Sequence, residues 1–271
     1  MSQPPSTSIT GLAPDAMAGK ICLSTAATSG IGLATAVAFA RAGAAAVIVT
    51  GRTTARGESA VAQIQATAAP GCEVRFISAD IGDDDSMGAC LAQIDADHGG
   101  LDVLTHCGFG EGALAPFMEM DPALYRPLVD GLYLAFPRAC RLAIPLMRKR
   151  GGGSIVCITS DAARVATPGE SVIGGALAAS VMFAKTLALE VGRENIRVNA
   201  VTPSLVRGTG SFDLVMGHEF SRKIFSIIEK KAKLGIPAAE DVAQTVAYLS
   251  SPMAAFVTGQ VISVNGGISI A

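Results

Sequence analysis

A glycine-rich turn near the start of the sequence carries the residue types that bind phosphate. It reads TAATSGIG over residues 25–32, between a short β-branched run and an Ala-rich helical stretch. Glycines in such a turn let backbone N–H groups approach a pyrophosphate, and the helix N-terminus favours the negative charge. The candidate contacts are Thr25, Gly30, Ile31 and Gly32. Similar turns also serve only to pack a helix on a strand, so both interpretations stay open.

A second candidate phosphate contact follows the next β-branched run. That run ends at Gly51 and Arg52, nineteen residues after Gly32. In dinucleotide-binding proteins a carboxylate near this position binds the ribose 2′-hydroxyl, whereas an Arg suits a 2′-phosphate. If a nucleotide binds at the turn, the sequence therefore predicts one whose ribose carries a phosphate.

An imidazole and a thiol stand together at the end of the fourth predicted strand, as His106 and Cys107. Open α/β sheets bind ligands at the carboxyl ends of their strands, so these two groups are candidates for an acid/base or nucleophilic pair. Consecutive strand residues point to opposite faces of the sheet, however. We therefore favour packing or solvent contact for both side chains over mutual contact.

The elements that must position these residues follow a regular alternation. Short β-branched runs are expected at residues 21–25, 46–50, 74–78, 103–106, 154–159, 197–201 and 261–264. Helices are expected between them near 31–42, 55–68, 84–97, 122–149, 171–191 and 240–250. This alternation predicts an α/β fold with a single doubly wound parallel sheet of about seven strands and helices on both faces.

The domain organisation is predicted to be simple. Residues 1–17 are rich in Pro, Ser and Thr and are expected to form a flexible N-terminal tail, followed by a single domain over 18–271. Residues 204–238 break the alternation, with several glycines and a basic amphipathic piece at 221–233. A long insertion near the end of a doubly wound domain commonly covers the ligand site. We expect it to form a lid.

Composition excludes several classes of protein. The chain has 271 residues, a net charge of −2 and only 16% charged residues. This apolar content excludes disorder over the whole chain, and the lack of a basic run argues against a nucleic-acid or anionic-membrane partner. The uncharged stretches 21–40 and 242–271 are interrupted by Gly, Ser, Thr, Pro and Asn. No transmembrane helix is predicted.

Cysteine and histidine usage favours a reducing compartment. The six cysteines never form a CxxC pair, and the three histidines form no ligand cluster, so no metal site is predicted. The cysteines are expected to be small buried apolar residues. The N-terminal segment lacks the basic head and apolar core of a signal peptide. These features predict a cytoplasmic protein.

The order and spacing of seven segments resemble the short-chain dehydrogenase/reductase family over about residues 18–268. The segments are TAATSGIG (25–32), ADI (79–81), LDVL (101–104), GGGSIVCITS (151–160), KTLALE (185–190), NIRVNAVTP (195–203) and FVTGQVISVNGG (256–267). The resemblance implies a Rossmann-type fold, an NADP or NAD cofactor, and hydride transfer between nicotinamide and a carbonyl or alcohol carbon. It also implies that Asp80 and Ile81 contact the adenine, and that Arg52 favours NADP over NAD.

The family's catalytic residues are mostly replaced in this sequence. An ungapped alignment over GSIVCITS to LALE places the family's Ser on Ser160, its Tyr on Ile173 and its Lys on Leu177. The family's Asn falls on Asp130. Since Ile173 and Leu177 are four residues apart, they share one helix face as an apolar pair. Proton transfer by a positioned side chain contributes roughly 10²–10⁴-fold, so ordinary redox catalysis is expected to be largely lost.

The cofactor segments also depart from the family pattern. The first glycine of the family turn falls on Ala26, and the NNAG segment after strand four is His106-Cys107-Gly108-Phe109. The Pro-Gly after strand six is Pro203-Ser204. A side chain at the tight turn of Ala26 is expected to cost about 1 kcal/mol or to redirect the backbone.

Three polar residues converge if the family geometry applies. Asp130, Ser160 and His106 would then give a carboxylate, a hydroxyl and an imidazole, which suit proton abstraction or addition–elimination chemistry. The alternative is polar lining of a vestigial cleft. Nearby, Asp161 and Arg164 are expected to form a local surface pair. Glu170 is expected to be a solvated helix start, favoured by the helix dipole.

Two functions remain open. In the first, the chain is a catalytically inactive subunit of a hetero-oligomeric NAD(P)-dependent dehydrogenase/reductase whose substrate carries a hydroxyl or keto group on a small hydrophobic molecule or acyl thioester. Its partner is an active paralogue or a second copy, bound through the apolar helices at 122–149 and 171–191 and the last strand. In the second, it is an enzyme: an NADP-dependent oxidoreductase with Ser160, water or Glu170 as proton source, or a non-redox lyase, isomerase or hydrolase using Asp130, Ser160 or His106.

Overall fold

The centre of the molecule is a seven-stranded, all-parallel sheet with the order β3-β2-β1-β4-β5-β6-β7. The structure, a computed structural model, describes residues 12–108 and 114–270. The strands are β1 (Ile21–Ser24), β2 (Ala46–Gly51), β3 (Glu73–Ser78), β4 (Val103–Cys107), β5 (Gly153–Ile158), β6 (Ile196–Pro203) and β7 (Val261–Val264). The predicted doubly wound sheet is confirmed. The strand order reverses between β1 and β4, which is where such sheets bind ligands.

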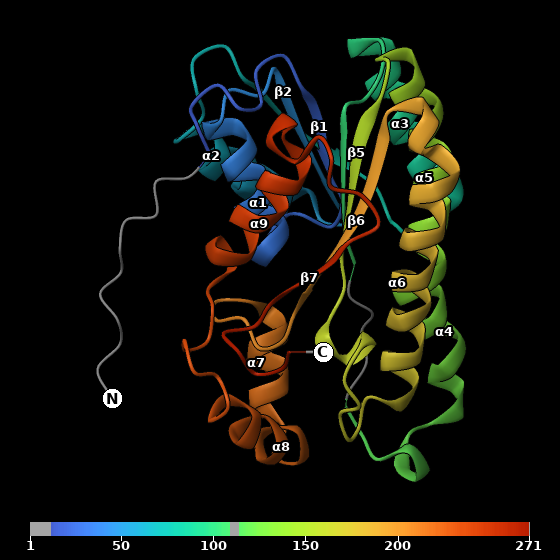
Figure 1. Cartoon of the computed structure of the whole chain (residues 1–271), viewed down its shortest axis with the longest axis vertical. Coiled ribbons are helices and arrows are strands. Elements are labelled where there is room, and N and C mark those ends of the chain that lie inside the picture. Colours follow the sequence, from blue (N-terminus) through green and yellow to red (C-terminus); the bar gives the residue numbers. More distant parts are fainter. Residues whose placement is uncertain (1–11, 109–113, 271) are drawn as a thin grey trace.

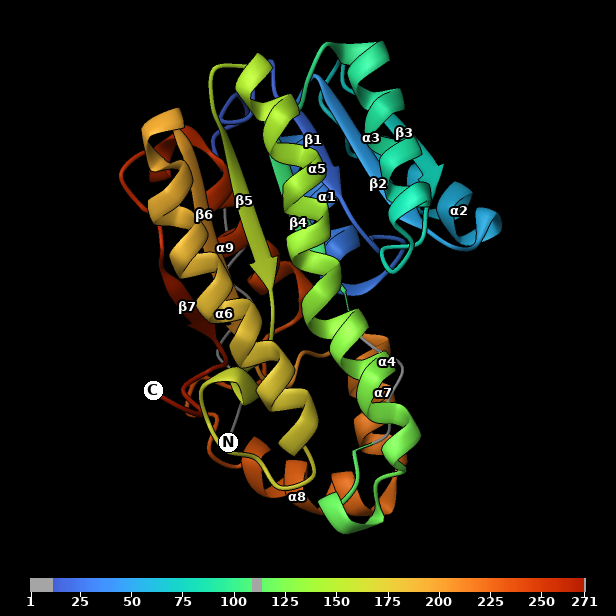
Figure 2. The same cartoon turned by 90° about the vertical axis from the view of Figure 1, so that its right-hand side faces the viewer.

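Helices cover both faces of the sheet (Figures 1 and 2). On one face lie α1 (Gly30–Arg41), α2 (Thr54–Gln65) and α9 (Ala239–Ser250), and on the other α3 (Asp84–His98), α5 (Ala135–Lys149) and α6 (Ser171–Val191). Side chains alternate along each strand between the two layers, as a parallel sheet buried on both sides requires. In β1, Leu23 packs beneath α5, whereas Cys22 packs beneath α1. The predicted strands and helices exist with ends within a few residues of those expected, except that the helix expected over 122–149 is divided.

The packed part of the chain begins before residue 18. Met17 is fully buried in the layer that contains α1, and its N–H donates to the carbonyl oxygen of Ala42 at 2.9 Å. The expected boundary between tail and domain is therefore too late, because an apolar side chain of the assigned tail belongs to the core. Residues 1–11 of that tail, like residue 109 of the expected cofactor segment, lie outside the described residues.

The helix expected over 122–149 is divided by a π-helical turn. The described elements are a short 3-10 turn, η2 (Pro122–Leu124), then α4 (Tyr125–Val129), the π turn η3 (Asp130–Leu134) and α5. The π turn begins at Asp130, the residue that aligns with the family's Asn. Such turns insert one residue into a helix and occur frequently at functional sites.

The segment expected to be a lid contains two helices. They are α7 (Gly210–Gly217) and α8 (Glu219–Glu229), and they lie beyond the carboxyl ends of the strands, beside α4 (Figure 2). The basic amphipathic piece forms most of α8 and buries Phe225 in a small cluster with Leu205 and Ile236. Its place in the fold suits a cover over the ligand end of the sheet, and the lid function stays a prediction.

One helix in the described part of the chain, Ser171–Glu194, is long and apolar enough to cross a membrane by length and composition. It contains α6, which is not an uncharged run because Lys185 and Glu190 interrupt it. The inner side of α6 packs on the sheet through Ala184 and Leu187. Helices in the core of an α/β protein commonly have this composition, because one side meets the sheet and the other meets neighbouring helices.

Candidate active site

The glycine-rich turn connects β1 to α1 at the position where the strand order reverses. The N–H of Thr25 donates to the carbonyl oxygen of Thr105 at 3.0 Å, and the N–H of Ala27 donates to that of Thr50 at 2.9 Å. The turn is thus tied to both neighbouring strands. Ala26 takes the left-handed conformation that glycine favours, with φ +47°. The alanine therefore does not redirect the backbone and accepts strain of about 1–2 kcal/mol.

Two glycines of the turn are required by close packing and conformation. A Cβ at Gly32 would lie 2.8 Å from the Cα of Ala27 and 3.3 Å from the Sγ of Cys107. Gly30 has φ +55° and lies against the side chain of Thr209, with 3.4 Å between the methyl group and a Cβ at Gly30. Ser29 precedes α1 without capping it through its side chain, and the first turn of α1 holds no acidic residue. This helix N-terminus therefore suits a phosphate.

The residues expected at the adenosine end lie at the same edge of the sheet. Arg52 is exposed directly after β2, and Asp80 follows β3, where its Oδ1 accepts a hydrogen bond from the N–H of Gly82 at 2.9 Å. Ile81 packs towards the end of β4, since its Cδ1 would lie 2.7 Å from a Cβ at Gly108. The candidate residues after β1, β2 and β3 and the end of β4 therefore lie at one edge of the sheet, where doubly wound folds bind ligands.

His106 and Cys107 point to opposite faces of the sheet. The His106 ring packs against Phe136 of α5 with 5.2 Å between centroids, whereas the Cys107 sulfur lies against Gly32 of α1. Burial lowers the pKa of His106 to about 4 and raises the pKa of Cys107 to about 12. At neutral pH the imidazole is neutral and the thiol is protonated, so a Cys–His nucleophilic pair does not form.

The hydroxyl of Thr25 holds the end of β4 in place. It accepts a hydrogen bond from the N–H of Cys107 and donates one to the carbonyl oxygen of the same residue, both at 3.1 Å. It also lies 3.4 Å from Nδ1 of His106. Thr25, a candidate cofactor contact, is completely buried, and its hydroxyl links the glycine-rich turn to the end of β4.

Asp130 and Ser160 have separate local partners. The half-exposed carboxylate of Asp130 pairs with Arg138 at 3.7 Å. The Ser160 hydroxyl accepts a hydrogen bond from the N–H of Ala162 at 3.2 Å, which caps the 3-10 turn η4 (Asp161–Ala163). Within residues 12–108 and 114–270, no hydrogen bond or ion pair joins any two of His106, Asp130 and Ser160. The expected convergence of these three polar groups therefore does not include direct contact between any two of them.

The positions of the family's Tyr and Lys are buried in an apolar cluster. Ile173 and Leu177 are 1% and 2% exposed and lie on one face of α6, as the sequence spacing predicts. The other buried members of the cluster are Met120, Leu128, Leu132 and Ala176. Two tyrosines, Tyr125 and Tyr133, also pack on this cluster. By sequence both tyrosines are set aside because neither lies near α6 along the chain, whereas the fold packs them against this cluster.

Glu170, directly before α6, is not the solvated helix start that we expected. It is 9% exposed, and its side chain makes no capping bond to the helix. Burial raises the pKa of Glu170 to about 7, the hydrogen bond with Thr167 opposes this rise, and the charge of Asp161 adds to it. The carboxyl group lies one helical turn before Ile173 and can gain or lose a proton near neutral pH.

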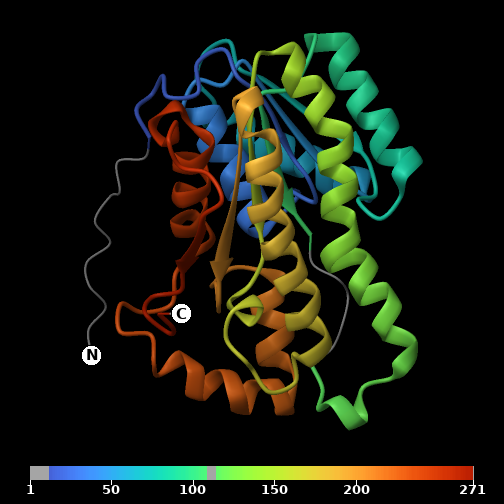
Figure 3. The same cartoon turned by 45° about the vertical axis from the view of Figure 1, so that its right-hand side comes forward.

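Asp161 is also buried rather than part of a surface pair with Arg164. Its Oδ1 accepts a hydrogen bond from Ser263 Oγ at 3.2 Å, and its Oδ2 accepts bonds from Asn265 Nδ2 at 2.5 Å and Ser269 Oγ at 2.9 Å. Arg164 instead donates to Ser263 Oγ at 2.8 Å. The expected pair is wrong because Arg164 bonds to Ser263 of β7, and Asp161 bonds to Ser263 and to the segment after β7. The chain near the C-terminus runs beside the loop into α6 (Figure 3).

The remaining titratable groups add no metal or disulfide chemistry. Among the described residues, no three His, Cys, Asp or Glu side chains gather as a metal site would. All six cysteines are free; Cys72 is half-buried and the other five are buried, as expected.

The doubly wound sheet, its glycine-rich turn and the sequence relationships define the class of protein. A sequence model of the family described as "Enoyl-(Acyl carrier protein) reductase" matches residues 25–269. The chain belongs to the short-chain dehydrogenase/reductase family of oxidoreductases, whose members generally bind NAD(P).

Individual relatives agree with this assignment. The human "Dehydrogenase/reductase SDR family member 4" is 33% identical over 257 residues, covering 93% of this chain and 88% of that protein. The 3-oxoacyl-(acyl-carrier-protein) reductase of Thermotoga maritima is 29% identical, covering 93% and 98%. A solved 7α-hydroxysteroid dehydrogenase, complexed with NADH and 7-oxo glycochenodeoxycholic acid, has a TM-score of 0.84 at 28% identity, covering 94% and 96%.

Proposed function

We propose that this chain is a nucleotide-binding subunit without redox catalysis of its own, which assembles with a catalytically active short-chain dehydrogenase/reductase. The observation that carries this proposal is the burial of Ile173 and Leu177 in an apolar cluster. Neither side chain can donate a proton or lower the pKa of a donor, and no ionisable group replaces them on the same face of α6. The assembled complex would act on a hydroxyl or keto group of a small hydrophobic molecule or an acyl thioester.

The proposed cofactor is NADP rather than NAD. The N-terminus of α1 and the backbone around Gly30 and Gly32 would hold the pyrophosphate, and Arg52 would lie near the 2′-phosphate. Asp80 and Ile81 would contact the adenine. In active members of the family the bound cofactor would supply a hydride to a carbonyl carbon; this chain would bind and orient the cofactor without that transfer.

Assembly is proposed to use an exposed seam on α6. Met182 and Leu189 are 62% and 84% exposed, and together with Gly175, Ala179 and Thr186 they follow a spacing of three and four residues. This spacing is typical of helices that pair along their length. The expectation of an equally apolar surface on α5 is not met, because its exposed positions include Arg141, Arg148 and Lys149. Arg148 and Lys149 already pair with Glu194 and Asp95 of this chain, so the apolar part of the proposed interface lies on α6.

A second candidate function is supported by Glu170. A buried carboxyl group with a pKa of about 7 meets the requirement for a general acid at neutral pH. In this alternative the chain is an active NADP-dependent reductase in which Glu170 donates the proton that Tyr donates elsewhere in the family. Non-redox chemistry with Asp130, Ser160 or His106 is less well supported, since the three groups make no mutual contact.

Cofactor titration of the purified chain separates the two candidates. NADPH and NADH binding is measured by the change in nicotinamide fluorescence, and turnover is measured with ketone and 3-oxoacyl thioester substrates. Binding of NADPH without turnover is the expected result. Turnover that disappears in Glu170→Gln would instead establish the second candidate.

Placing the family's Tyr and Lys at positions 173 and 177 tests directly whether the loss of this pair explains the proposed inactivity. The double variant Ile173→Tyr with Leu177→Lys is expected to gain measurable carbonyl reduction, because a proton donor and its pKa-lowering cation return together. The control variant Ile173→Phe with Leu177→Met changes the same positions without adding either group and is expected to remain inactive. An inactive double variant that still binds NADPH would show that more than the proton relay is missing.

The partner is sought by co-purification. The tagged chain is expressed in its own cells, and its co-purifying proteins are identified by mass spectrometry, with an active family member of similar length as the expected partner. The unpaired cysteines support a cytoplasmic location for the complex. A stable homo-oligomer with its own turnover would overturn the proposal of an inactive subunit.

A further inference from the structure

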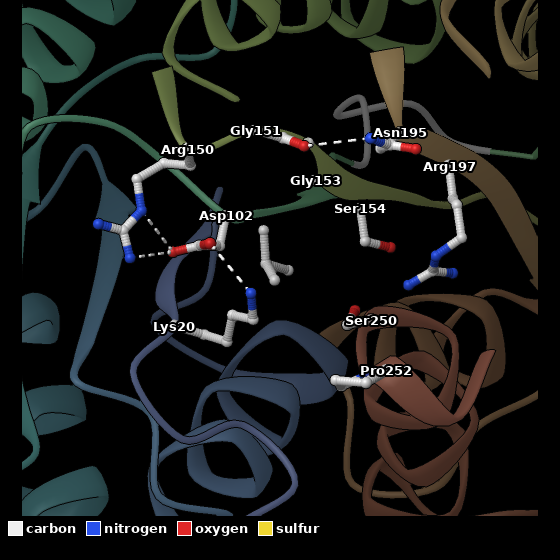
Figure 4. A pocket seen from close by; sticks show the side chains of 12 residues that line it. Lys20, Asp102, Arg150, Gly151, Gly153, Ser154, Asn195, Arg197, Ser250 and Pro252 are labelled. Atoms are coloured by element: carbon white, nitrogen blue, oxygen red, sulfur yellow. Dashed lines mark hydrogen bonds and ion pairs between the residues drawn. The ribbon is translucent and has the colours of Figure 1, made fainter. Parts of the chain in front are cut away.

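A polar pocket lies at the amino-terminal edge of the sheet, opposite the edge that carries the glycine-rich turn. Its volume is about 220 Å³, and it lies where β1, β4, β5 and β6 begin and α9 ends (Figure 4). The polar side chains that line it include Lys20, Asp102, Arg150, Ser154, Arg197 and Ser250. None of these residues belongs to the proposed cofactor site, so the inference below does not rest on the proposed function.

The pocket holds more positive than negative charge. Asp102 is 4% exposed and pairs with Lys20 at 3.2 Å and with Arg150 at 3.1 Å. Arg197 is the third cation on the wall. The C-termini of α5 and α9 lie close by and contribute roughly −0.5 charge each. Three positive charges against one carboxylate and these two partial charges leave the pocket positive by about one unit.

Arg197 has no acidic partner in the part of the chain that the structure describes. Its guanidinium donates to the carbonyl oxygens of Leu249 at 2.6 Å, Ser251 at 3.2 Å and Val257 at 3.4 Å. Burial lowers the pKa of Arg197, so the surroundings disfavour its charge. Three carbonyl oxygens accept from part of its five N–H donors but do not neutralise its charge, and an anion in the pocket would supply the missing counter-charge.

The hydroxyl of Ser250 is a second unmatched group on the wall. Ser250 is 4% exposed, and its Oγ has no hydrogen-bond partner. The neighbouring hydroxyl of Ser154 donates to the carbonyl oxygen of Leu249 at 3.0 Å and retains its acceptor capacity. A buried hydroxyl without a partner is uncommon, because it forfeits its hydrogen bonds to water. A ligand in the pocket that hydrogen-bonds to the Ser250 hydroxyl would supply its missing partner.

We propose that this pocket binds a phosphate group, either as inorganic phosphate or on a small phosphate monoester. Lys and Arg donors are the usual ligands of phosphate oxygens, and the spare donors of Lys20, Arg150 and Arg197 surround the space. The volume is below the roughly 300 Å³ of pockets for drug-sized ligands, which restricts the ligand to a small molecule. Bound phosphate would link the start of β6 to the end of α9.

Titration with inorganic phosphate tests the proposal on the intact chain. Binding is followed by ³¹P NMR at constant ionic strength, with chloride as the replacement anion. Saturable binding to one site is expected. Ser250→Ala and Lys20→Gln are each expected to raise the Kd about tenfold, since each removes a hydrogen bond to a charged oxygen. Ser250→Ala should fold normally because it removes a hydroxyl that has no partner.

The matched control is Lys149→Gln. It removes a surface cation next to Arg150 that pairs with Asp95 at 2.6 Å and does not line the pocket. Its Kd for phosphate is expected to equal that of the unmodified chain. If all three variants bind phosphate equally, or the unmodified chain does not bind it, the proposal is wrong.

Glycerol 3-phosphate distinguishes the two sources of the phosphate group. A Kd several-fold below that of inorganic phosphate, lost in parallel in Ser250→Ala and Lys20→Gln, would identify a monoester as the ligand. Equal or weaker binding would identify inorganic phosphate. NADPH affinity, measured by fluorescence in the same variants, is expected to stay unchanged because the two edges of the sheet are separate. Phosphate bound at the glycine-rich turn would be displaced by NADPH and unaffected by Ser250→Ala and Lys20→Gln, so these variants and NADPH competition distinguish the two sites.

Discussion

Ala26 is the residue at which the glycine-rich turn departs most clearly from glycine. It is exposed and keeps a φ of +47°. The left-handed conformation costs a non-glycine residue about 1–2 kcal/mol, whereas a glycine adds about 0.5–1 kcal/mol of conformational freedom to the unfolded chain. The strain is the larger effect. Ala26→Gly is therefore expected to raise the free energy of unfolding by about 0.5–1 kcal/mol, measured by urea denaturation.

Ala62→Gly provides the control for this prediction. Ala62 is an exposed residue inside α2, where glycine lowers the free energy of unfolding by about 1 kcal/mol. The two substitutions are the same in chemistry and opposite in expected sign. A loss of stability in both would show that the turn does not strain Ala26.

Glu170 makes the free energy of unfolding depend on pH in a way that the sequence alone does not predict. Its pKa is about 7 in the folded protein, against 4.5 as the ordinary value, so between these values the folded state binds more protons than the unfolded state. The contribution of Glu170 to stability is complete below pH 4.5 and is lost as the pH rises through 7. The total loss is about 3 kcal/mol. Relative to Glu170→Gln, the unmodified chain should lose this amount between pH 4.5 and pH 8.

The measurement is the difference in urea unfolding free energy between the two proteins across this pH range. Taking a difference cancels other titrations, such as that of His106, whose buried ring lowers stability as the pH falls from 6.5 towards 4. Glu58→Gln, at an exposed position of α2, should run parallel to the unmodified chain. A parallel profile for Glu170→Gln would contradict the burial of the Glu170 carboxyl group.

At the scale of single residues, the sequence predicts side-chain directions that depend only on the spacing of residues within one helix or strand. The shared face of Ile173 and Leu177 follows from helical periodicity, and the opposite directions of His106 and Cys107 follow from strand alternation. The burial of Glu170 and Asp161 depends on segments that are far away along the chain. Asp161 meets Ser269, which is 108 positions away, and no local pattern encodes such a contact.

At the scale of elements, Asp161 connects η4 to the segment after β7. Asp161→Ala removes the acceptor of three hydrogen bonds, including those from Asn265 and Ser269. Because bonds to a buried carboxylate are worth about 1.5–3 kcal/mol each and part of the loss is recovered by rearrangement, we expect a total cost of about 3 kcal/mol. Hydrogen exchange should accelerate specifically in residues 263–270. Mass spectrometry of peptides from this segment provides the measurement.

Asp84→Ala serves as the comparison for Asp161→Ala. Asp84 begins α3, is exposed, and pairs with Arg138 at 3.3 Å. An exposed ion pair of this kind contributes about 0–1 kcal/mol. If both variants cost the same, or if exchange in 263–270 stays slow in Asp161→Ala, the segment after β7 is held by other contacts.

The order of the elements was predictable from sequence, whereas the division of one helix was not. The apolar positions in 122–149 are compatible with a single helix, and the sequence expectation was one helix. The π turn η3 depends on packing instead: Ser180 of α6 donates to the carbonyl oxygen of Leu132 at 2.9 Å, so a backbone acceptor in the turn faces the neighbouring helix. A hydrogen bond that crosses between helices has no signal in the local sequence.

At the scale of the whole molecule, the exposed seam on α6 predicts assembly. Met182→Glu and Leu189→Glu place charges on two exposed apolar side chains that lie two helical turns apart. Either change should shift the protein to a smaller species, because burying an unpaired charge in an interface costs several kcal/mol. Light scattering coupled to size-exclusion chromatography gives the mass of each species.

Ile227→Glu tests whether any exposed apolar residue has this effect. Ile227 is 61% exposed and belongs to α8, a different helix from the one that carries the seam. Its substitution should leave the mass of the assembly unchanged. If the α6 variants also retain the original mass, the seam is not an interface.

The global architecture is the part of the structure that the sequence predicts best. Alternating strand and helix patterns allow few arrangements, and a parallel sheet covered on both faces is the favoured one. The pocket at the amino-terminal edge was not predicted, because Lys20, Asp102, Arg197 and Ser250 come from four separate segments. Each of these residues looks like an ordinary surface or helix-end residue until the sheet brings them together.

The π turn η3 also sets the phase of the helix that precedes it. One residue in a helix corresponds to a rotation of about 100° around the axis. Deleting a single residue between Asp130 and Leu134 would restore ordinary helical winding and turn α4 by about this angle relative to α5. Leu128, now 2% exposed in the cluster with Ile173, would then leave that cluster. The packing of the apolar cluster around Ile173 and Leu177 therefore depends on the number of residues in η3 as well as on the side chains of the cluster.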